Sequence, residues 1–436
     1  MVHNSCSIDM GAASKTEKLR IHYNFIKEFT VANSKKITSK HLYYNLSRRN
    51  FIKGATAGAV IMGAPAILKG LTRRAKAESG VVRFLMTAPT MIPGDWSVFE
   101  KETGIRLEGE VMKDDPGLFL NEVLVNDAGD RFDLISTLSG AEQEMINGEA
   151  IIPIEHSNLS NWAGMPEAIK QVPYLTRDLK PEGGTVWGTP LAMNADSFGY
   201  FPDKLGEPYP PEDVSWSLVF EDERTMGKSA TGTMYYYLEE CAMFLKGAGK
   251  VAINDPANMT PAEANATADY MIGRKEAGQF RSFHTTFDDQ VSLIKNGEVI
   301  AIRCWEPAVK EAQKAGMTDF VYANAVEGYM KWMHACYIPT QVQDRGNFEE
   351  VYTFLNWLLS GAYSAAISPL RGYVSGRPDL GAEYAKSMGL GDEAGTAIQE
   401  AQDKLKNKFS HEQMWFTAVP EHLQDIQAAT DRVLNA

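Results

Sequence analysis

The sequence has few of the residues on which enzyme and metal chemistry most often depends. It holds four cysteines without a CxxC pair, and eight histidines. It contains no G-x-S-x-G, H-E-x-x-H, G-x-G-x-x-G or P-loop motif. These absences argue against a thioredoxin-type or zinc-ribbon site, against the common hydrolase signatures and against nucleotide binding. We therefore expect no catalytic residue, no metal site and no cofactor, and we predict that the chain is not an enzyme.

Basic residues are scarce after the first 77 positions. Residues 1–77 hold 14 of the 43 Lys and Arg and three of the 56 Asp and Glu, so the remainder has 29 basic and 53 acidic groups, a net charge of −24. Nucleic-acid binding needs a basic surface that neutralises phosphates, so this composition argues against it. The acidic balance is compatible with cationic ligands, although it also serves solubility.

Cysteine also limits the covalent cross-links. Cys6 lies in the basic N-terminal stretch, which leaves Cys241, Cys304 and Cys336, so at most one intramolecular disulfide can form in the remainder. Cys304 and Cys336 both stand in strand-like segments. The sequence leaves open whether they pair.

Long apolar runs are missing, and the most apolar one is short. Arg48-Arg49-Asn50-Phe51 precedes an uncharged, Gly- and Ala-rich run over 54–68, and Ala75-Lys76-Ala77 follows as an A-x-A-like cleavage site. The run has about 15 residues, whereas a membrane-spanning helix needs about 20. The pattern resembles a twin-arginine export signal. We predict a leader over 1–77, export by the twin-arginine machinery, cleavage near Ala77 and a periplasmic product.

From residue 81 onward, strand and helix patterns alternate with short connections. We expect strands at 81–86, 105–111, 132–136, 196–201 and 299–305. We expect helices at 96–104, 116–126, 140–149, 235–245, 262–278, 287–296, 306–315 and 348–359, and a helical tail over 394–435. Such alternation is typical of an α/β protein with a layered sheet.

Several short motifs occur in a familiar order. They are Phe99-Glu100-Lys101-Glu102-Thr103-Gly104-Ile105, Phe132-Asp133-Leu134-Ile135, Asn296-Gly297-Glu298-Val299 with Trp305, Trp332-Met333-His334 through Pro339, and Gly372-Tyr373. Together they resemble the bacterial extracellular solute-binding proteins, in particular the spermidine/putrescine-binding branch that serves ABC importers. The resemblance covers nearly all of 81–436.

The resemblance implies a periplasmic-binding-protein-like fold of type II, in which crossing strands join two α/β lobes around a central cleft. Lobe 1 would hold 81–192 and 332–371, and lobe 2 would hold 193–331 and 372–436. The crossings would fall near 190–194, 331–334 and 371–373. The implied partners are a small-molecule ligand and an ABC permease in the inner membrane, and we expect a monomer. Hinged lobes that close on a ligand suit this task.

The same resemblance suggests where the ligand is held. Polyamine binders need carboxylates for ammonium groups and aromatic walls for methylene stems. Trp305 matches the aromatic wall of the family. The further candidate ligand contacts are Thr87, Ser139, Thr233, Tyr237, Glu306, His334 and Tyr373.

Three positions depart from the family pattern and leave the ligand class open. Met86-Thr87-Ala88-Pro89 stands where the family has Asn-Trp-Thr-Glu, His334 replaces an acid, and Thr231 to Tyr237 lacks the acids of the corresponding helix start. Either Glu306 or Asp133 supplies a compensating acid for an amine, or the ligand is an anion such as a carboxylate or sulfonate.

For an anion, the helix start at 231–233 would offer N–H groups and hydroxyls, and Arg303, Lys331 and His334 would assist. A metal-binding transport protein using Tyr235-Tyr236-Tyr237 and an exported enzyme are the more distant alternatives.

Overall fold

The computed structural model describes residues 80–87, 96–112, 116–138, 140–170, 185–206, 214–417 and 419–436, all within the compact unit Ser47–Ala436. The predicted leader, including Arg48 and Arg49, and the candidate Ser139 lie outside the described residues.

One mixed sheet runs through the described part of the chain. Its main path has the order β2-β1-β3-β10-β5-β8-β6-β7. We name β2, β1 and β3 the first strand group, and β8, β6 and β7 the second strand group. The strands are β1 (Val81–Met86), β2 (Arg106–Val111), β3 (Leu134–Leu138), β4 (Ile151–Ile152), β5 (Gly188–Tyr200), β6 (Ser229–Gly232), β7 (Phe280–His284), β8 (Ala301–Cys304), β9 (Val321–Tyr322), β10 (Tyr329–Pro339) and β11 (Met414–Phe416).

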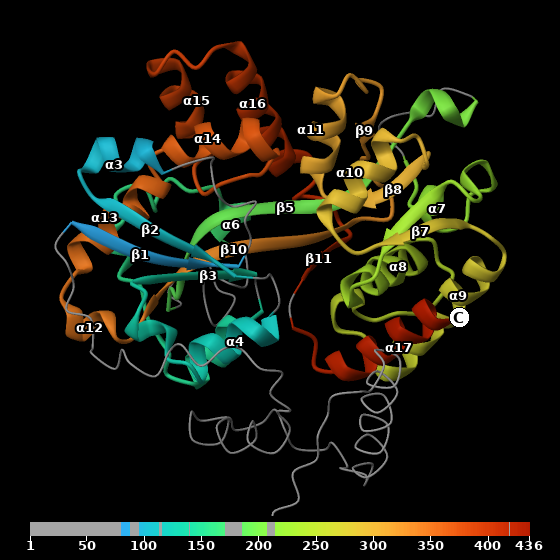
Figure 1. The fold of residues 1–436 in the computed structure, drawn as a ribbon, viewed down its shortest axis with the longest axis horizontal. Coiled ribbons are helices and arrows are strands. Elements are labelled where there is room, and N and C mark those ends of the chain that lie inside the picture. Colours follow the sequence, from blue (N-terminus) through green and yellow to red (C-terminus); the bar gives the residue numbers. More distant parts are fainter. Residues whose placement is uncertain are drawn as a thin grey trace, which may run out of the picture. The chain divides into compact units, whose positions relative to one another are not determined.

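The long strands β5 and β10 connect the two groups (Figure 1). They pair antiparallel from Met330↔Asp196 to Tyr337↔Gly188. β10 pairs with β3 of the first group, and β5 pairs with β8 of the second. Val374 also pairs with β5 in this region, because its N–H and C=O exchange hydrogen bonds of 3.0 and 2.8 Å with Met193.

Helices cover both strand groups (Figure 1). α13 packs on β1 and α3, whereas α8 packs on α9 and α17. The helices are α3 (Ser97–Thr103), α4 (Pro116–Leu124), α5 (Glu142–Asn147), α6 (Glu167–Lys170), α7 (Ser217–Phe220), α8 (Tyr235–Gly247), α9 (Pro261–Glu276), α10 (Phe287–Lys295), α11 (Glu306–Lys314), α12 (Val342–Arg345), α13 (Phe348–Leu358), α14 (Ala362–Arg371), α15 (Pro378–Ser387), α16 (Asp392–Asn407) and α17 (Leu423–Asn435).

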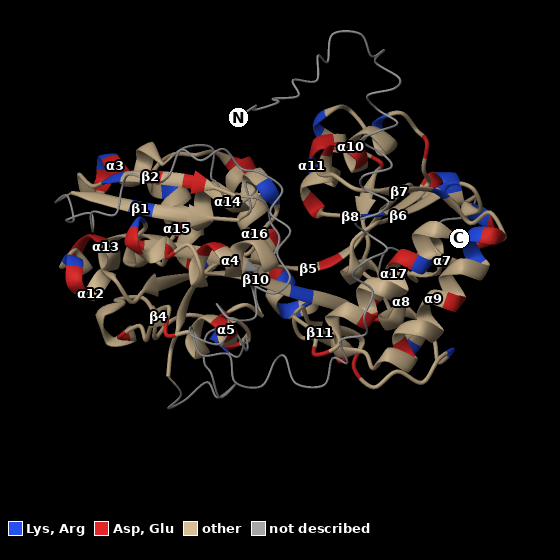
Figure 2. Cartoon of the chain, turned by 60° about the horizontal axis from the view of Figure 1, so that its bottom comes forward, with Lys and Arg blue, Asp and Glu red and all other residues tan. Residues whose placement is uncertain are grey.

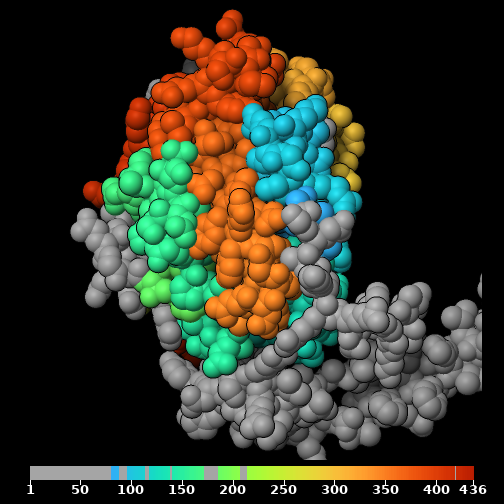
Figure 3. Space-filling model, turned by 90° about the vertical axis from the view of Figure 1, so that its left-hand side faces the viewer, coloured from blue at the N-terminus to red at the C-terminus, as the bar shows by residue number. Residues whose placement is uncertain are grey.

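Distant parts of the chain build each side of the molecule. Phe84 of β1, Phe99 of α3 and Phe354 of α13 form one aromatic cluster, with ring centroids 5.1 to 5.5 Å apart. Figure 3 shows the corresponding surface, where orange helices from the second half of the chain lie between cyan and green segments from its first half. The first strand group is therefore packed against residues that follow it in the sequence by more than 200 positions.

The C-terminal helices divide between the two sides. α15 and α16 pack on α14, whereas α17 packs on α8 and α9. The predicted helical tail over 394–435 contains two helices with β11 between them, because Met414, Trp415 and Phe416 pair with β10.

Strand β5 begins at Gly188, eight residues before the predicted start. Pro190 lies within the strand, and a proline in the sequence argues against predicting a central strand.

The three described cysteines are free and buried. Cys304 of β8 lies opposite Ser197, and Cys336 of β10 lies opposite Thr189, on the same strand β5. These two partners are eight residues apart, or about 26 Å at the rise of a strand. A disulfide needs Cα atoms within about 7 Å, so Cys304 and Cys336 cannot pair in this fold.

Candidate functional site

The carboxyl ends of the parallel strands meet near the middle of β5. The end of β3 reaches this region because Leu138 pairs with His334, and His334 pairs with Ala192 of β5. The end of β8 reaches it from the other side, where Cys304 pairs with Ser197. Ligands of open α/β sheets bind outside the carboxyl ends of strands, so residues around 192–197 form the candidate functional site.

The first strand group brings uncharged hydroxyl groups to this site. Thr87 directly follows β1, and Ser136 lies in β3 beside Met86. Both side chains are fully buried, and neither hydroxyl has a hydrogen-bond partner among the described residues. Buried polar groups are nearly always paired, so these two hydroxyls, one after β1 and one in the middle of β3, are candidate hydrogen-bonding groups for a ligand.

The second strand group brings charged side chains. Arg303 of β8 donates from Nε to both Glu240 oxygens, at 2.7 and 2.8 Å, and from Nη2 to Asp196 at 2.5 Å. Trp332 Nε1 donates to the other Asp196 oxygen at 2.7 Å. All four side chains are buried. Figure 2 shows ribbon segments of both charge signs along β5 and β10.

Burial shifts the ionisation of this charged cluster. Desolvation raises the pKa of Glu240 to about 7, although Arg303 opposes the shift. Desolvation also raises the pKa of Asp196 and that of Tyr237, the latter to about 12. Arg303 lies 4.6 Å from the Tyr237 ring centroid, which places a predicted ligand contact against the cluster.

Trp305 lies beside the same cluster. It follows β8 as the residue before α11, its N–H donates to Gln290 at 3.0 Å, and its side chain is half-buried. The Arg303 guanidinium lies 5.7 Å from its ring centroid. A partly exposed tryptophan at a strand end remains able to stack on a ligand.

Glu306, the next predicted contact, already has strong partners. Lys404 Nζ donates to both of its oxygens at 2.6 Å, and Asn194 Nδ2 donates to Oε2 at 3.0 Å. Burial alone raises the pKa of Glu306, but Lys404 and Lys408 bring it below its usual value. Its charge is therefore compensated within the protein.

Asp133, the other acid considered for an amine, is also engaged. It forms an ion pair of 2.9 Å with Arg345 Nε and accepts the Arg83 N–H at 2.9 Å. It directly precedes β3, so it lies at the opposite end of that strand from the candidate site.

His334 and Tyr373 lie together. Both are buried, and their rings pack edge-on against Trp332, with centroids 5.7 Å and 5.0 Å away. Trp332 contacts Asp196 in turn. These two predicted contacts are thus linked to the charged cluster through one tryptophan.

Thr233 lies at the end of β6 and is half-buried. Its N–H donates to the His284 carbonyl oxygen at 3.1 Å, and its hydroxyl lies 3.5 Å from that of Thr285. His284 Nε2 in turn bonds the Arg303 carbonyl oxygen at 2.8 Å. The Thr233 N–H is therefore not one of the open groups that an anion seat at this helix start would need.

Sequence reasoning missed several residues of the site. Asp196, Glu240, Asn194 and Trp332 were not among the candidate ligand contacts, and Thr231 was considered only as part of an anion seat, yet all five are buried here. One signal was available for two of them: Asn194 and Asp196 interrupt an otherwise apolar strand pattern, and buried polar residues in such a pattern need partners.

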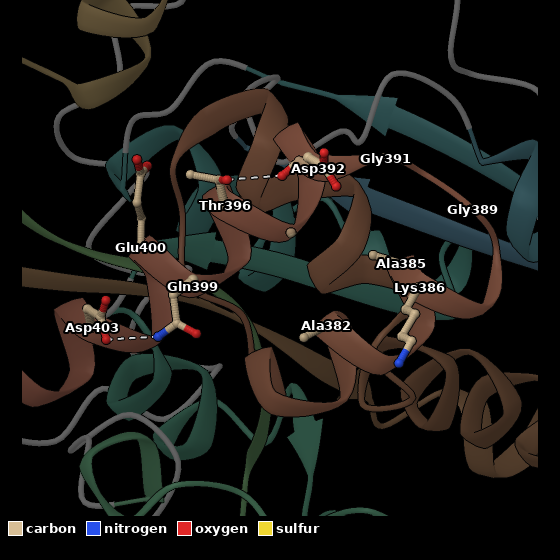
Figure 4. A pocket seen from close by; sticks show the side chains of 11 residues that line it. Ala382, Ala385, Lys386, Gly389, Gly391, Asp392, Thr396, Gln399, Glu400 and Asp403 are labelled. Carbon is tan, nitrogen blue, oxygen red and sulfur yellow. Dashed lines mark hydrogen bonds between the residues drawn. The ribbon is translucent and has the colours of Figure 1, made fainter.

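A separate hollow lies between α15 and α16 (Figure 4). It has a volume of about 870 Å³, and Thr396 and Gln399 on its wall donate to Asp392 and Asp403 of the same helix. Small residues, including Ala382, Ala385 and Gly395, also line it. Its lining includes none of the buried unpaired groups found at the strand ends.

Two further properties concern the described residues alone. They contain no helix that is both long and apolar enough to cross a membrane. The same part of the chain contains no group of three or more His, Cys, Asp or Glu side chains that could hold a metal ion.

Comparison with solved structures shows the fold. The spermidine/putrescine ABC transporter substrate-binding protein PotD from Streptococcus pneumoniae, solved with calcium and HEPES, is similar with a TM-score of 0.61 at 14% identity, over 82% of this chain and 98% of that one. The TpPotD lipoprotein of Treponema pallidum gives 0.60 at 12% identity, over 81% and 99%. AgtB from A. tumefaciens R10, solved with agropinic acid, gives 0.51 at 15% identity, over 82% and 97%.

These similarities confirm the predicted α/β, periplasmic-binding-protein-like fold. No curated protein matches the chain. The model of the family described as bacterial extracellular solute-binding protein matches residues 97–390, which is more than half of the sequence. The chain therefore belongs to the bacterial extracellular solute-binding protein family, whose members bind small solutes.

Proposed function

We propose that this chain is the periplasmic substrate-binding component of an ABC importer and captures a small polar organic solute that carries an amine, as polyamines do. One observation carries this proposal. The carboxyl ends of strands from both groups meet at 192–197, and each group presents buried polar atoms that have no partner among the described residues. A small molecule with several polar groups would satisfy them.

Individual side chains have complementary roles in this proposal. Trp305 forms an aromatic wall for the carbon stem of the solute. Asn194 Oδ1 is buried without a hydrogen-bond partner in the described part, and it can only accept, so it suits an ammonium or N–H group. Thr87 and Ser136 add hydroxyls from the first strand group, and His334 and Tyr373 extend the wall beside Trp332. Ser139, Thr233, Tyr237 and Glu306 complete the proposed surroundings.

The proposed site lies between two lobes that close on the solute. Lobe 1 comprises 81–192 and 332–371, and lobe 2 comprises 193–331 and 372–436. The contacts of α15 and α16 with α14 favour moving 378–407 into lobe 1, because α14 belongs to that lobe. The link from Lys404 of α16 to Glu306 of α11 would then join the two lobes.

The wider proposal concerns export and delivery. The twin-arginine machinery would recognise Arg48 and Arg49, and cleavage near Ala77 would release a monomer into the periplasm. The loaded monomer would dock on an ABC permease in the inner membrane. In this role the protein transfers its solute unchanged and is not an enzyme.

An anionic solute is the second candidate, and the charged cluster argues against it. Arg303 would be its natural partner, but Asp196 and Glu240 already oppose that positive charge. A carboxylate or sulfonate placed here would face two carboxylates in a poorly solvated region.

A thermal-shift screen tests the proposed function. The purified protein is heated with amines, amino acids, organic acids and sulfonates, since a ligand that binds only the folded state raises the melting temperature. We expect stabilisation by at least one amine-bearing compound and none by simple sulfonates. Stabilisation by anions alone would favour the second candidate, and metal analysis of the same sample tests the metal-carrier alternative.

A further inference from the structure

Two buried donors stand on neighbouring strands of the second strand group, and neither has a hydrogen-bond partner in the described part of the chain. They are Arg303 Nη1 and the Thr231 hydroxyl. The Arg303 side chain is 1% exposed, and Thr231 is fully buried. Buried polar groups are nearly always paired, so both donors are candidate contacts for a ligand.

The strand register places these donors together. β6 and β8 are parallel neighbours, in which Ser229 pairs with Ala301 and Ala230 with Ile302. Continued by one residue, this register puts Thr231 beside Arg303 on the same face of the sheet, near the carboxyl ends of both strands. The site they form is flanked by the rings of Tyr237 and Trp305, 4.6 and 5.7 Å from the guanidinium.

The direction of Arg303 Nη1 is fixed. Nε and Nη2 of the same planar group are held by Glu240 and Asp196, and Trp332 holds Asp196 from the other side. Because the guanidinium is rigid and planar, fixing two nitrogens fixes the third. Nη1 is therefore a preorganised donor.

Charge limits what these donors can bind. Nη1 can only donate, so it cannot accept a bond from an ammonium group, and its positive charge repels one. A ligand carboxylate is also disfavoured, because Asp196 and Glu240 already oppose the charge of Arg303. A neutral oxygen fits both conditions, since it accepts hydrogen bonds without adding charge.

We propose that Arg303 Nη1 and the Thr231 hydroxyl hold a neutral oxygen of the ligand, a hydroxyl or an amide carbonyl. The inference rests on the proposed function and narrows it: the solute bears an amine at one end and a neutral oxygen group at the other. A simple diamine would leave both donors unpaired.

Four probes with the same four-carbon stem test the inference. Each has one amine, and the other end is an amine, a primary amide, a hydroxyl or a carboxylate: putrescine, 4-aminobutanamide, 4-amino-1-butanol and 4-aminobutanoate. Affinity is measured by calorimetry with the purified protein. We expect the amide and the alcohol to bind about tenfold more tightly than the diamine and the carboxylate, the effect of about one good hydrogen bond.

Thr231→Val removes the hydroxyl at nearly constant volume. It should weaken binding of the amide and alcohol about five- to tenfold, leave the diamine unchanged and leave the melting temperature equal or higher, because an unpaired buried hydroxyl is lost. Thr231→Ser should restore the preference. Thr267→Val is the matched control, because Thr267 is buried in α9 and its hydroxyl already donates to the Glu263 carbonyl at 2.9 Å; it should leave the preference intact.

The outcomes separate the inference from the proposed function. If putrescine binds best, or if Thr231→Val weakens all probes equally, the oxygen subsite is wrong while the amine-binding function stands. If Thr231→Val lowers the melting temperature and leaves the ranking unchanged, the hydroxyl serves only an internal water and the inference also fails. If no probe binds, the proposed amine ligand fails together with the subsite.

Discussion

The two strand groups bring different chemistry to the same place. The buried polar groups of the first strand group include the hydroxyls of Thr87, directly after β1, and of Ser136, in the middle of β3. At the end of β8, Arg303 is held between Asp196 and Glu240. A hydroxyl can donate or accept a hydrogen bond, so it restricts the ligand group little. A fixed, buried charged cluster restricts both the charge of the ligand group and the direction of its hydrogen bonds. The difference suggests that the second strand group selects the solute and the first one adapts to it.

The largest expected effect is a difference in the loss of folding stability when a residue that contacts each strand group is replaced. Asp196→Ala removes one carboxylate from Arg303 and the acceptor of Trp332, and breaking a buried ion pair costs about 3 to 5 kcal/mol. Ser136→Ala removes a hydroxyl with no described partner and should change stability by less than about 1 kcal/mol. Urea unfolding measures both. Equal losses would show that the charged cluster is no more constrained than the hydroxyls.

An intermediate effect concerns ligand affinity. Trp305→Leu should weaken binding of the solute found in the screen about ten- to hundredfold, because it removes an aromatic face beside Arg303. Trp96→Leu is the control: Trp96 is also half-buried, but it packs on Phe354, 5.7 Å away, on the first side of the molecule. It should lower the melting temperature without changing affinity. If calorimetry shows that Trp96→Leu weakens binding and Trp305→Leu does not, the ligand does not contact Trp305.

The last expected effect is a dependence of stability on pH. Lys408 is buried between Tyr322 and Tyr329, with Nζ 4.4 and 5.2 Å from their centroids, and burial lowers its pKa to about 7. Between this value and about 10.5, the unfolded chain binds more protons, so stability should rise with pH in that window by up to about 1.4 kcal/mol per pH unit. Well below pH 7, this unfavourable contribution is fully present.

Lys408→Met should flatten that slope between pH 7.5 and 9.5, measured by urea unfolding at several pH values. Lys295→Met, at an exposed position at the end of α10, should leave it unchanged. If the slope of stability against pH is the same in the unmodified protein and in both variants, Lys408 stays charged in the folded state. Its buried charge is then stabilised by neighbouring groups.

Local signals in the sequence predicted most elements of the fold. Gly104 ends α3 at a positive φ of 74°, as the pattern indicated, and α8, α10, α11 and α13 lie close to their predicted ranges. The boundaries that failed depend on distant pairing. β11 is a strand only because β10 lies beside it, and the first half of β5 contains a proline that local rules exclude from a central strand.

The candidate site was less accessible from sequence. Trp305 could be proposed from its motif, but Arg303 contacts Glu240 and Asp196 across 63 and 107 positions, and one sequence carries no signal for such pairs. The acids proposed for an amine, Glu306 and Asp133, were plausible by position alone. The cations that pair with them, Lys404 and Arg345, come from later helices. The sequence therefore carried no sign that the charges of these two acids are compensated within the protein.

The thiols of the described region have a consequence for how the protein matures. Burial raises the pKa of Cys304 to about 12 and raises those of Cys241 and Cys336 as well. Thiol oxidation proceeds through the thiolate, so these groups react slowly with oxidants. Because no covalent bridge joins them, this region can complete its fold in a reducing compartment as readily as in an oxidising one, without help from oxidative folding catalysts.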